Sequence, residues 1–276
     1  MDTREIVKKY NFKFSKSLGQ NFLCDEETVD GIIKKAEVSK DDTVIEIGPG
    51  VGTMTEKLLN AAKFVYAVEI DKNLIQILSN EFNNYDNLKI IEGDALKIDF
   101  SKIAEGKKNV KVVANLPYYI ATPIVMRLIK NKYGLKSITV MVQKELGERF
   151  EAKPCSKAYG EISVLMQYLC SVRIVKSVPS SMFIPKPKVD SVVVRLDLLE
   201  KPPVHVDDEN MFEKVVKSAF AMRRKTLYNA LSRGMGIEGT KLKEILKISE
   251  IDPKRRGETL TIEEFANLSD NIKKYF

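Results

Sequence analysis

Residues 43–53, TVIEIGPGVGT, carry an apolar strand-like run directly into a glycine-rich turn and then into a helical pattern. Glycines in such a turn let the backbone approach a bound molecule, and the N-terminus of the next helix favours electronegative groups. The spacing of Gly48, Gly50 and Gly52 is G-x-G-x-G, which differs from the G-x-G-x-x-G of dinucleotide-binding folds. The stretch therefore predicts the first strand–turn–helix unit of an α/β domain, with a ligand site at the turn.

Short β-branched runs alternate with helical patterns through most of the chain. Seven candidate strands occupy residues 43–48, 64–70, 88–93, 110–115, 137–143, 172–178 and 190–198. This alternation predicts right-handed crossovers and a mostly parallel, seven-stranded sheet with helices on both faces. Residues 179–188, PSSMFIPKPK, leave no room for a crossover helix, so we expect the last strand to run antiparallel.

A change of composition near residue 200 predicts a domain boundary. Residues 200–210, EKPPVHVDDEN, have the composition of a linker, with two prolines followed by acidic residues. Beyond them the pattern is only helical, and the chain contains no internal repeat or low-complexity tract. We therefore expect residues 1–199 to form the α/β domain and residues 200–276 to form a small helical domain.

The composition excludes several kinds of chemistry. The 276 residues include one histidine, His205, so histidine-dependent hydrolysis and histidine-rich zinc sites are disfavoured. Cys24, Cys155 and Cys170 are odd in number and widely spaced, which offers no metal-ligand pattern and suits a reduced, cytoplasmic compartment. The N-terminus has no apolar signal region, and no apolar run approaches the roughly 18 residues of a membrane span. We expect a cytoplasmic protein without a metal or a membrane.

Two carboxylates follow neighbouring strands at the same edge of the predicted sheet. Glu69 ends the second candidate strand about 20 residues after Gly48, where a carboxylate can accept both hydroxyls of a ribose. Asp94 follows the third candidate strand, where it can accept a hydrogen bond from an adenine amino group. Each feature alone also fits a tight turn or a solvated strand end, but together they favour a nucleoside cofactor.

The segment Asn115-Leu116-Pro117-Tyr118 follows the fourth candidate strand. Asn and Pro can simply end a strand in a turn, but each position also has a chemical use. Asn115 offers an amide oxygen, and Pro117 favours an extended Leu116 whose carbonyl can point into a cleft. Tyr118 offers an aromatic face for a base. Two hydrogen-bond acceptors and an aromatic ring are suited to bind a planar base that carries an exocyclic amine.

With these motifs, the sequence resembles the ribosomal RNA adenine dimethyltransferases of the KsgA/RsmA type, which are class I S-adenosylmethionine enzymes. The matching segments are SLGQNFLCDEETVDGII, VIEIGPGVGTMTEKLL, VYAVEID, EGDAL, NLPYYIATPIV, VQKELGERF, SKAYGEISVLMQY, VPSSMFIPKPKVDSVVVRL and FAMRRKTLYNAL. The resemblance implies a Rossmann-like, seven-stranded methyltransferase domain with a small C-terminal helical domain. It also implies two methyl transfers to N6 of each of two adjacent adenosines in a hairpin loop near the 3′ end of small-subunit (16S) rRNA.

The resemblance also assigns residues. Cofactor contacts would come from Asn21, Leu23, Gly48, Glu69, Asp94 and Asn115. Asn115 and the Leu116 carbonyl would orient the reacting amine, and Tyr118 and Phe183 would flank the target base. For Phe183, a core position in its proline-rich loop stands as the alternative. The implied partner is small-subunit rRNA or an immature 30S particle, and we expect the chain to act as a monomer.

The charge of the chain is consistent with an RNA partner. Forty-five Lys and Arg against 38 Asp and Glu give a net charge of +7, which favours a polyanion. Arg223, Arg224 and Lys225 are candidate RNA contacts in the helical domain. Residues 200–276 nevertheless hold 15 basic and 13 acidic residues, so a diffuse solvated face remains the alternative.

Three functional readings follow from the sequence. The first is the small-subunit rRNA dimethyltransferase, which the RRKTL segment and the NLPYYIATP form favour. The second is an Erm-type enzyme that methylates 23S rRNA. The third is a largely non-catalytic RNA-binding or ribosome-assembly factor that retains the pocket. An oxidoreductase is disfavoured by the glycine spacing and by the NLPY segment.

Overall fold

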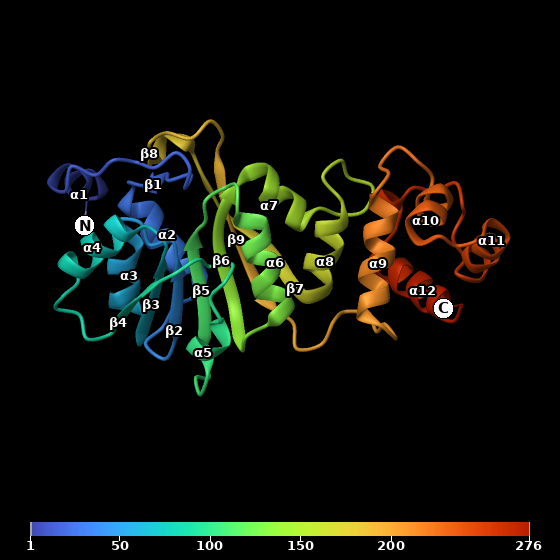
Figure 1. Ribbon diagram of the computed structural model, residues 1–276, viewed down its shortest axis with the longest axis horizontal. Coiled ribbons are helices and arrows are strands. Elements are labelled where there is room, and N and C mark those ends of the chain that lie inside the picture. The colour runs from blue at the N-terminus through green and yellow to red at the C-terminus, as the bar shows by residue number, and fades with distance from the viewer. Residues whose placement is uncertain (1, 276) are drawn as a thin grey trace. The chain divides into compact units, whose positions relative to one another are not determined.

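In a computed structural model, which describes residues 2–275, the chain divides into two compact units (Figure 1). The first unit contains the residues up to Gly147 together with Ser171–Leu198. The second contains Glu148–Cys170 and the residues from Leu199 onward. The sequence predicts a division at residue 199, whereas the second compact unit also includes Glu148–Cys170, a segment that precedes Ser171 of the first unit.

The first unit is built on a seven-stranded sheet with the order β4-β3-β2-β5-β6-β9-β7. Its strands are β2 (Thr43–Ile47), β3 (Phe64–Glu69), β4 (Leu88–Glu92), β5 (Val110–Asn115), β6 (Leu135–Gln143), β7 (Cys170–Val178) and β9 (Ser191–Leu198). The pairs β2–β3, β2–β5, β3–β4 and β5–β6 are parallel, and β6–β9 is antiparallel. The seven predicted strands and the antiparallel direction of the last one are confirmed.

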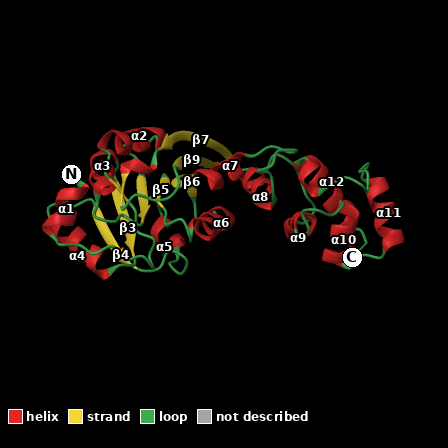
Figure 2. Ribbon diagram, turned by 90° about the horizontal axis from the view of Figure 1, so that it is seen from above, coloured by secondary structure: helices red, strands yellow, loops and turns green. Residues whose placement is uncertain are grey.

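The central strands are buried on both faces, which explains why their sequences are rich in β-branched residues. All five residues of β2 are buried, as central parallel strands require when helices cover both faces. Figure 2 shows α2 and α3 on one side of the strands and α5 and α6 on the other. The helices of this unit are α1 (Thr3–Lys9), α2 (Glu26–Ala36), α3 (Thr53–Ala61), α4 (Lys72–Glu81), α5 (Phe100–Ala104) and α6 (Ala121–Asn131). Because β2, β3, β4 and β5 run parallel, their carboxyl ends lie at the same edge of the sheet. The strand order reverses at β2, on this part of the sheet.

A two-stranded antiparallel sheet, which the sequence did not reveal, ties the N-terminal segment to the segment after β7. It consists of β1 (Phe22–Leu23) and β8 (Phe183–Ile184). A short 3₁₀ helix, η1 (Ser180–Met182), leads into β8. Strands of two residues carry no readable alternation, so only the pairing between distant segments defines them. This pairing places the N-terminal segment beside the ligand edge of the large sheet.

The second unit is helical. It contains α8 (Glu161–Leu169), α9 (Glu209–Phe220), α10 (Leu227–Met235), α11 (Gly239–Ile248), η2 (Gly257–Thr259) and α12 (Ile262–Lys273), while α7 (Lys144–Glu151) crosses the boundary. The Tyr168 ring of α8 packs on Phe212 of α9 with centroids 4.7 Å apart. The buried Tyr159 hydroxyl donates to the Leu260 carbonyl at 2.9 Å. These contacts explain why the insertion belongs with the C-terminal helices, although it lies between β6 and β7 in the sequence.

Candidate active site

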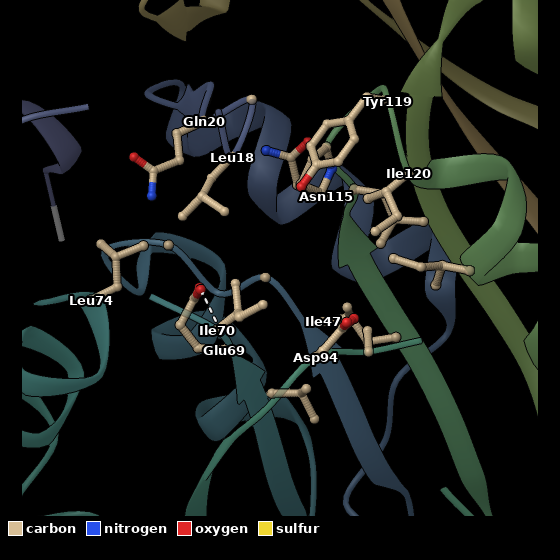
Figure 3. Close-up of a pocket in the computed structure, with 18 of the residues that line it drawn as sticks. Leu18, Gln20, Ile47, Glu69, Ile70, Leu74, Asp94, Asn115, Tyr119 and Ile120 are labelled. Atoms are coloured by element: carbon tan, nitrogen blue, oxygen red, sulfur yellow. Dashed lines mark hydrogen bonds between the residues drawn. The ribbon is translucent and has the colours of Figure 1, made fainter. Parts of the chain in front are cut away.

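A cavity of about 810 Å³, counted with its open mouth, lies at the carboxyl ends of the central strands of the first unit. Gly48 follows β2, Glu69 ends β3, Asp94 follows β4 and Asn115 ends β5, so four strand ends contribute to the lining. Figure 3 shows Glu69, Asp94 and Asn115 in the cavity. The N-terminal segment 18–22 lines the opposite side and forms the roof of the cavity. The structure thus brings together residues that the sequence places on separate strands.

The glycine-rich turn after β2 forms one wall of the cavity. Gly48 has φ +70° and Gly50 has φ +61°, which are left-handed values that glycine adopts without a steric penalty. A Cβ on Gly50 would lie 3.1 Å from the Phe22 ring of the roof, whereas a Cβ on Gly48 would meet only the Asn115 carbonyl at 3.6 Å. The turn therefore packs tightly under the roof at Gly50 and leaves open space for a ligand at Gly48.

Glu69 is the buried acid of the cavity, with 6% of its surface exposed. Its Oε1 accepts a hydrogen bond from the backbone amide of Ile70 at 2.8 Å (Figure 3) and another from that of Asp71 at 2.9 Å. Burial raises the pKa of the Glu69 carboxyl, and these amides oppose that shift because they stabilise the charged form. A buried carboxylate on a rigid strand end can bind vicinal hydroxyls, as the sequence predicts.

Asp94 lies beside Glu69, one strand further along the sheet. The Glu69 carbonyl accepts from Gly93 N at 2.8 Å, which fixes the turn that carries Asp94. Asp94 Oδ1 accepts from Leu96 N at 2.9 Å. The two acids and the glycine-rich turn fit a nucleoside cofactor, because they place acceptors along two adjacent strand ends.

The NLPY segment closes the other side of the cavity. Asn115 Nδ2 donates to the Asn21 carbonyl of the roof at 3.0 Å, so Oδ1 is the remaining acceptor of the amide. Leu116 N donates to Met141 O at 3.3 Å, and its side chain is buried. Leu116 therefore continues the strand ladder, as expected for a residue before proline, and it lines the cavity.

Tyr118 lines the cavity as a half-buried ring. Its hydroxyl lies 2.8 Å from Ser191 Oγ, and burial raises the pKa of the phenol. The phenol therefore stays protonated at neutral pH. An aromatic ring at this position can stack on a planar base, as the sequence predicts.

Comparison with known proteins identifies the family. The sequence model of the ribosomal RNA adenine dimethylase family matches residues 11–272, which is almost the whole chain. This protein belongs to the ribosomal RNA adenine dimethylase family. The resemblance drawn from the motifs is thereby confirmed.

Relatives within the dimethylase family match over their full length. Ribosomal RNA small subunit methyltransferase A of Clostridium acetobutylicum is 55% identical over 271 residues, covering 98% of both chains. The protein of the same name from Clostridium botulinum strain Loch Maree is 54% identical over 272 residues, covering 99% of this chain and 98% of its own.

Solved structures agree on the fold. A dimethyladenosine transferase from Plasmodium falciparum matches with a TM-score of 0.77 and 27% identity, covering 92% of this chain and 98% of its own. The 23S rRNA methyltransferase ErmE matches with a TM-score of 0.70 and 22% identity, covering 91% of this chain and 99% of its own, which bears on the fold alone. The expected class I methyltransferase fold is confirmed.

Two residues that the dimethylase family resemblance assigned lie outside the large cavity. Leu23 is buried and lines a smaller neighbouring cavity of about 420 Å³. Phe183 is 5% exposed and pairs with Leu23 across the β1–β8 sheet, within the hydrophobic core. Phe183 therefore occupies the core position that the sequence left open as an alternative, and the structure does not place its ring against the cavity.

The three candidate RNA contacts lie in the second unit. Arg223, Arg224 and Lys225 are exposed in the turn between α9 and α10. The Arg223 guanidinium donates to the Lys157 carbonyl at 2.5 Å, which gives it a structural partner. Lys225 and Arg233 line a surface hollow of about 690 Å³ that also includes two polar side chains of α10. This surface supplies cationic and polar groups of the kind that bind phosphates.

Sequence reasoning missed three features of the site. Gln20 Nε2 donates to Asp71 Oδ2 at 2.8 Å and ties the roof to the turn after β3. Tyr119 is 62% exposed at the mouth of the cavity, where its ring packs over Gly19. Glu46 is wholly buried beneath the glycine-rich turn. Gln20 precedes Asn21 and Tyr119 follows Tyr118, and this position in the sequence is the only signal that could have predicted them.

Glu46 is the least expected of these residues. Its Oε2 accepts from the Thr55 hydroxyl at 2.7 Å, while Oε1 has no hydrogen-bond partner among the described residues. Burial raises the pKa of this carboxyl to about 8, with a smaller contribution from the nearby Glu69 charge. A neutral carboxylic acid is therefore favoured at neutral pH.

Within residues 2–275, no group of three or more His, Cys, Asp and Glu side chains is placed to hold a metal ion. In the same part of the chain, no helix is long and apolar enough to cross a bilayer.

Proposed function

We propose that this protein dimethylates N6 of two adjacent adenosines in a hairpin loop near the 3′ end of small-subunit (16S) rRNA, with S-adenosyl-L-methionine as methyl donor. The observation that carries the proposal is the Asn115 amide, which donates to the Asn21 carbonyl at 3.0 Å in the cavity that Glu69, Asp94 and Tyr118 also line. The family membership and the names of the full-length relatives support the substrate class.

The first unit supplies the cofactor site. Glu69 would accept the ribose hydroxyls, Asp94 the adenine amino group, and the turn at Gly48 would accommodate the rest of the molecule. Backbone groups of the roof at Asn21 would complete the site, with Leu23 packed behind them. When bound, S-adenosylmethionine supplies an electrophilic methyl group on a positively charged sulfur.

Asn115 and Leu116 would orient the target amine. The N6 lone pair of adenine is delocalised into the ring, so the amine is a poor nucleophile. If Asn115 Oδ1 and the Leu116 carbonyl both accept hydrogen bonds from N6, the nitrogen can become pyramidal and direct its lone pair out of the ring plane. Alignment in a site that excludes water contributes more to this reaction than a strong base does. Such a scheme is consistent with a chain that has one histidine.

Tyr118 would capture the base. A base that reacts on its exocyclic amine must leave its stack, and an aromatic face compensates for the lost stacking. The Tyr118 ring lines the same cavity as Asn115 and Leu116, and its hydroxyl lies 2.8 Å from Ser191 Oγ of β9. A second transfer requires the pocket to admit N6-methyladenosine with its methyl group turned away from the donor.

The second unit would contribute to RNA binding. Arg223, Arg224 and Lys225 would contact phosphates, and affinity should fall with salt because counterions are released on binding. We further propose that the protein acts as a monomer in the cytoplasm during ribosome biogenesis, on a partly assembled 30S particle.

The test is methyl transfer to 30S particles and, separately, to 23S rRNA, both isolated from cells that lack this gene, followed by mapping of the modified nucleotides by mass spectrometry. We expect two adjacent N6,N6-dimethyladenosines near the 3′ end of 16S rRNA. Modification of 23S rRNA instead would favour an Erm-type enzyme. Tight binding of 30S particles without any methyl transfer would favour an assembly factor.

A further inference from the structure

The Tyr118 ring is held at its far end by a buried serine. The Tyr118 hydroxyl and Ser191 Oγ are 2.8 Å apart, and Ser191 is fully buried. Ser191 begins β9 and pairs with Gln143 at the end of β6. The contact therefore joins the cavity wall to the large sheet at a position 73 residues further along the chain.

The backbone around Ser191 is fixed on both sides. The Asp190 carbonyl accepts from Lys144 N at 3.0 Å, and Asp190 Oδ1 accepts from Ser180 N at 2.8 Å. Ser191 itself lies in the β6–β9 ladder. Its hydroxyl is consequently a stationary partner rather than one on a mobile loop.

The other end of the tyrosine is fixed as well. Leu116 N donates to Met141 O at 3.3 Å, and Ile120 N donates to the Pro117 carbonyl at 3.1 Å. Tyr118 thus starts from a turn anchored on both sides, which leaves the side-chain torsions as its remaining freedom. Because the phenol oxygen lies on the long axis of the ring, the hydrogen bond to Ser191 restrains the direction of this axis and holds the ring at one place in the cavity wall.

We propose that Ser191 is a positioning residue that holds the Tyr118 phenol and sets the position of the ring on which the target base stacks. The inference rests on the proposed function, because it concerns capture of the adenine. Ser191 does not line the cavity and acts only through Tyr118. The Tyr118 phenol remains neutral, so either hydroxyl can donate to the other.

The proposed role predicts which kinetic constant changes when the hydrogen bond between Tyr118 and Ser191 is lost. The base enters the pocket after the RNA particle has docked, and docking depends on cationic groups elsewhere. Loosening the ring should therefore slow methyl transfer at saturating substrate and leave the KM for the particle unchanged. A neutral hydrogen bond of this kind corresponds to a change of about three- to tenfold in rate.

The experiment is a double-mutant cycle with Tyr118→Phe, Ser191→Ala and the combined variant. Single-turnover methylation is measured on saturating unmodified 30S particles with labelled S-adenosylmethionine. We expect each single variant to slow transfer by about three- to tenfold and the combined variant to be no slower than either one. Equal rates for the wild type and both single variants, or fully additive losses in the combined variant, would overturn the role of Ser191.

Ser137→Ala is the matched control. Ser137 is a buried serine of β6, and its Oγ has no hydrogen-bond partner among the described residues. We expect Ser137→Ala alone to transfer the methyl group at the wild-type rate. We expect Ser137→Ala combined with Tyr118→Phe to be as fast as Tyr118→Phe alone. A loss in Ser137→Ala as large as that in Ser191→Ala would assign the effect to general destabilisation and overturn the inference.

A spectroscopic measurement on the free protein separates this inference from the proposed function. With 3-fluorotyrosine in place of the ten tyrosines, the Tyr118 ¹⁹F signal is the one missing in Tyr118→Phe. We expect Ser191→Ala to shift this signal and Ser137→Ala to leave it in place. An unmoved signal in Ser191→Ala would overturn the contact. Absence of transfer by the wild type would count against the proposed function, whatever the spectra show.

Discussion

The side-chain amide of Asn115 donates a hydrogen bond to the backbone carbonyl of Asn21 at 3.0 Å, across 94 residues of sequence. This contact joins the end of β5 to the roof of the cavity. It also orients the amide, since the amino group is used by the roof and the oxygen is left for a donor. The group proposed to direct the chemistry is therefore positioned by the segment that forms the roof of the cavity.

Replacing Asn115 with alanine should reduce methyl transfer by about 100-fold or more, since it removes one of two acceptors for the reacting amine. Cofactor affinity should fall less, because the Asn21 carbonyl belongs to the backbone and stays in place. Affinity for the 30S particle should hardly change. Single-turnover rates with saturating particles and cofactor provide the measurement, and a near wild-type rate would contradict the assignment.

Replacing Glu69 with alanine should weaken S-adenosylmethionine binding by about 10- to 100-fold, as expected for hydrogen bonds to a charged group. Calorimetric titration of the free protein measures the effect. The matched control is Glu92→Gln, because Glu92 pairs with Glu69 in the β3–β4 register but forms an exposed ion pair with Lys72. Unchanged affinity in Glu69→Ala would remove the ribose contact from the proposal.

Glu46 should make the stability of the free protein depend on pH. Burial raises the pKa of this carboxyl to about 8 from 4.5, so the folded state binds a proton more tightly than the unfolded state. Its favourable contribution is therefore complete below pH 4.5 and is lost as the pH rises towards 8, at no more than about 1.4 kcal/mol per pH unit.

The variant Glu46→Gln tests this dependence. The stability of Glu46→Gln relative to the wild type should increase from pH 5 to pH 8.5, since glutamine cannot ionise. Urea unfolding at several pH values measures the difference, with Glu92→Gln as an exposed control. A relative stability that stays constant with pH would show that Glu46 does not titrate in this range.

Replacing Gly52 with alanine should destabilise the first unit through both backbone and packing. Gly52 has φ +96°, and a Cβ there would lie 2.4 Å from the Phe82 ring. Gly106 has φ +70° but open space at its Cβ position, so Gly106→Ala measures the backbone cost alone, about 1–2 kcal/mol. We expect Gly52→Ala to cost about 1–3 kcal/mol more, as in overpacked cores. Equal costs in denaturant unfolding would contradict the packing argument.

Replacing Phe183 with alanine should lower the free energy of unfolding by about 3–5 kcal/mol, because the ring lies in the core. Phe183→Leu distinguishes packing from base stacking, since leucine fills much of the volume but has no aromatic face. We expect Phe183→Leu to retain most of the methyl-transfer rate. A loss of transfer in a stably folded Phe183→Leu protein would indicate that the Phe183 ring contacts the target base.

Much of the first unit could be predicted because its strands are long and buried on both faces. The β-branched runs of β2 and β5 stand out from the helical patterns around them. The insertion 148–170 could not be assigned, because amphipathic helices show that one face is buried but not which partner covers it.

In the site too, positions set by the local sequence could be predicted, whereas contacts between distant segments could not. Gly48, Glu69, Asp94 and Asn115 could be predicted because each ends or follows a recognisable strand. The partner of the Asn115 amide could not, since it depends on a roof segment with no regular pattern. Phe183 looks the same in sequence whether it faces a ligand or the core, and only the β1–β8 pairing decides.

The sheet order also bears on how this chain is made. β9 is the last strand to leave the ribosome, yet it lies between β6 and β7 in the finished sheet. Until β9 has been synthesised, β6 therefore has an unpaired edge, and such an edge can pair with other chains. β8, which pairs with β1 of the roof segment, also emerges late. A nascent chain that stops before residue 191 thus lacks an inner strand of its sheet and the Ser191 hydroxyl that holds Tyr118.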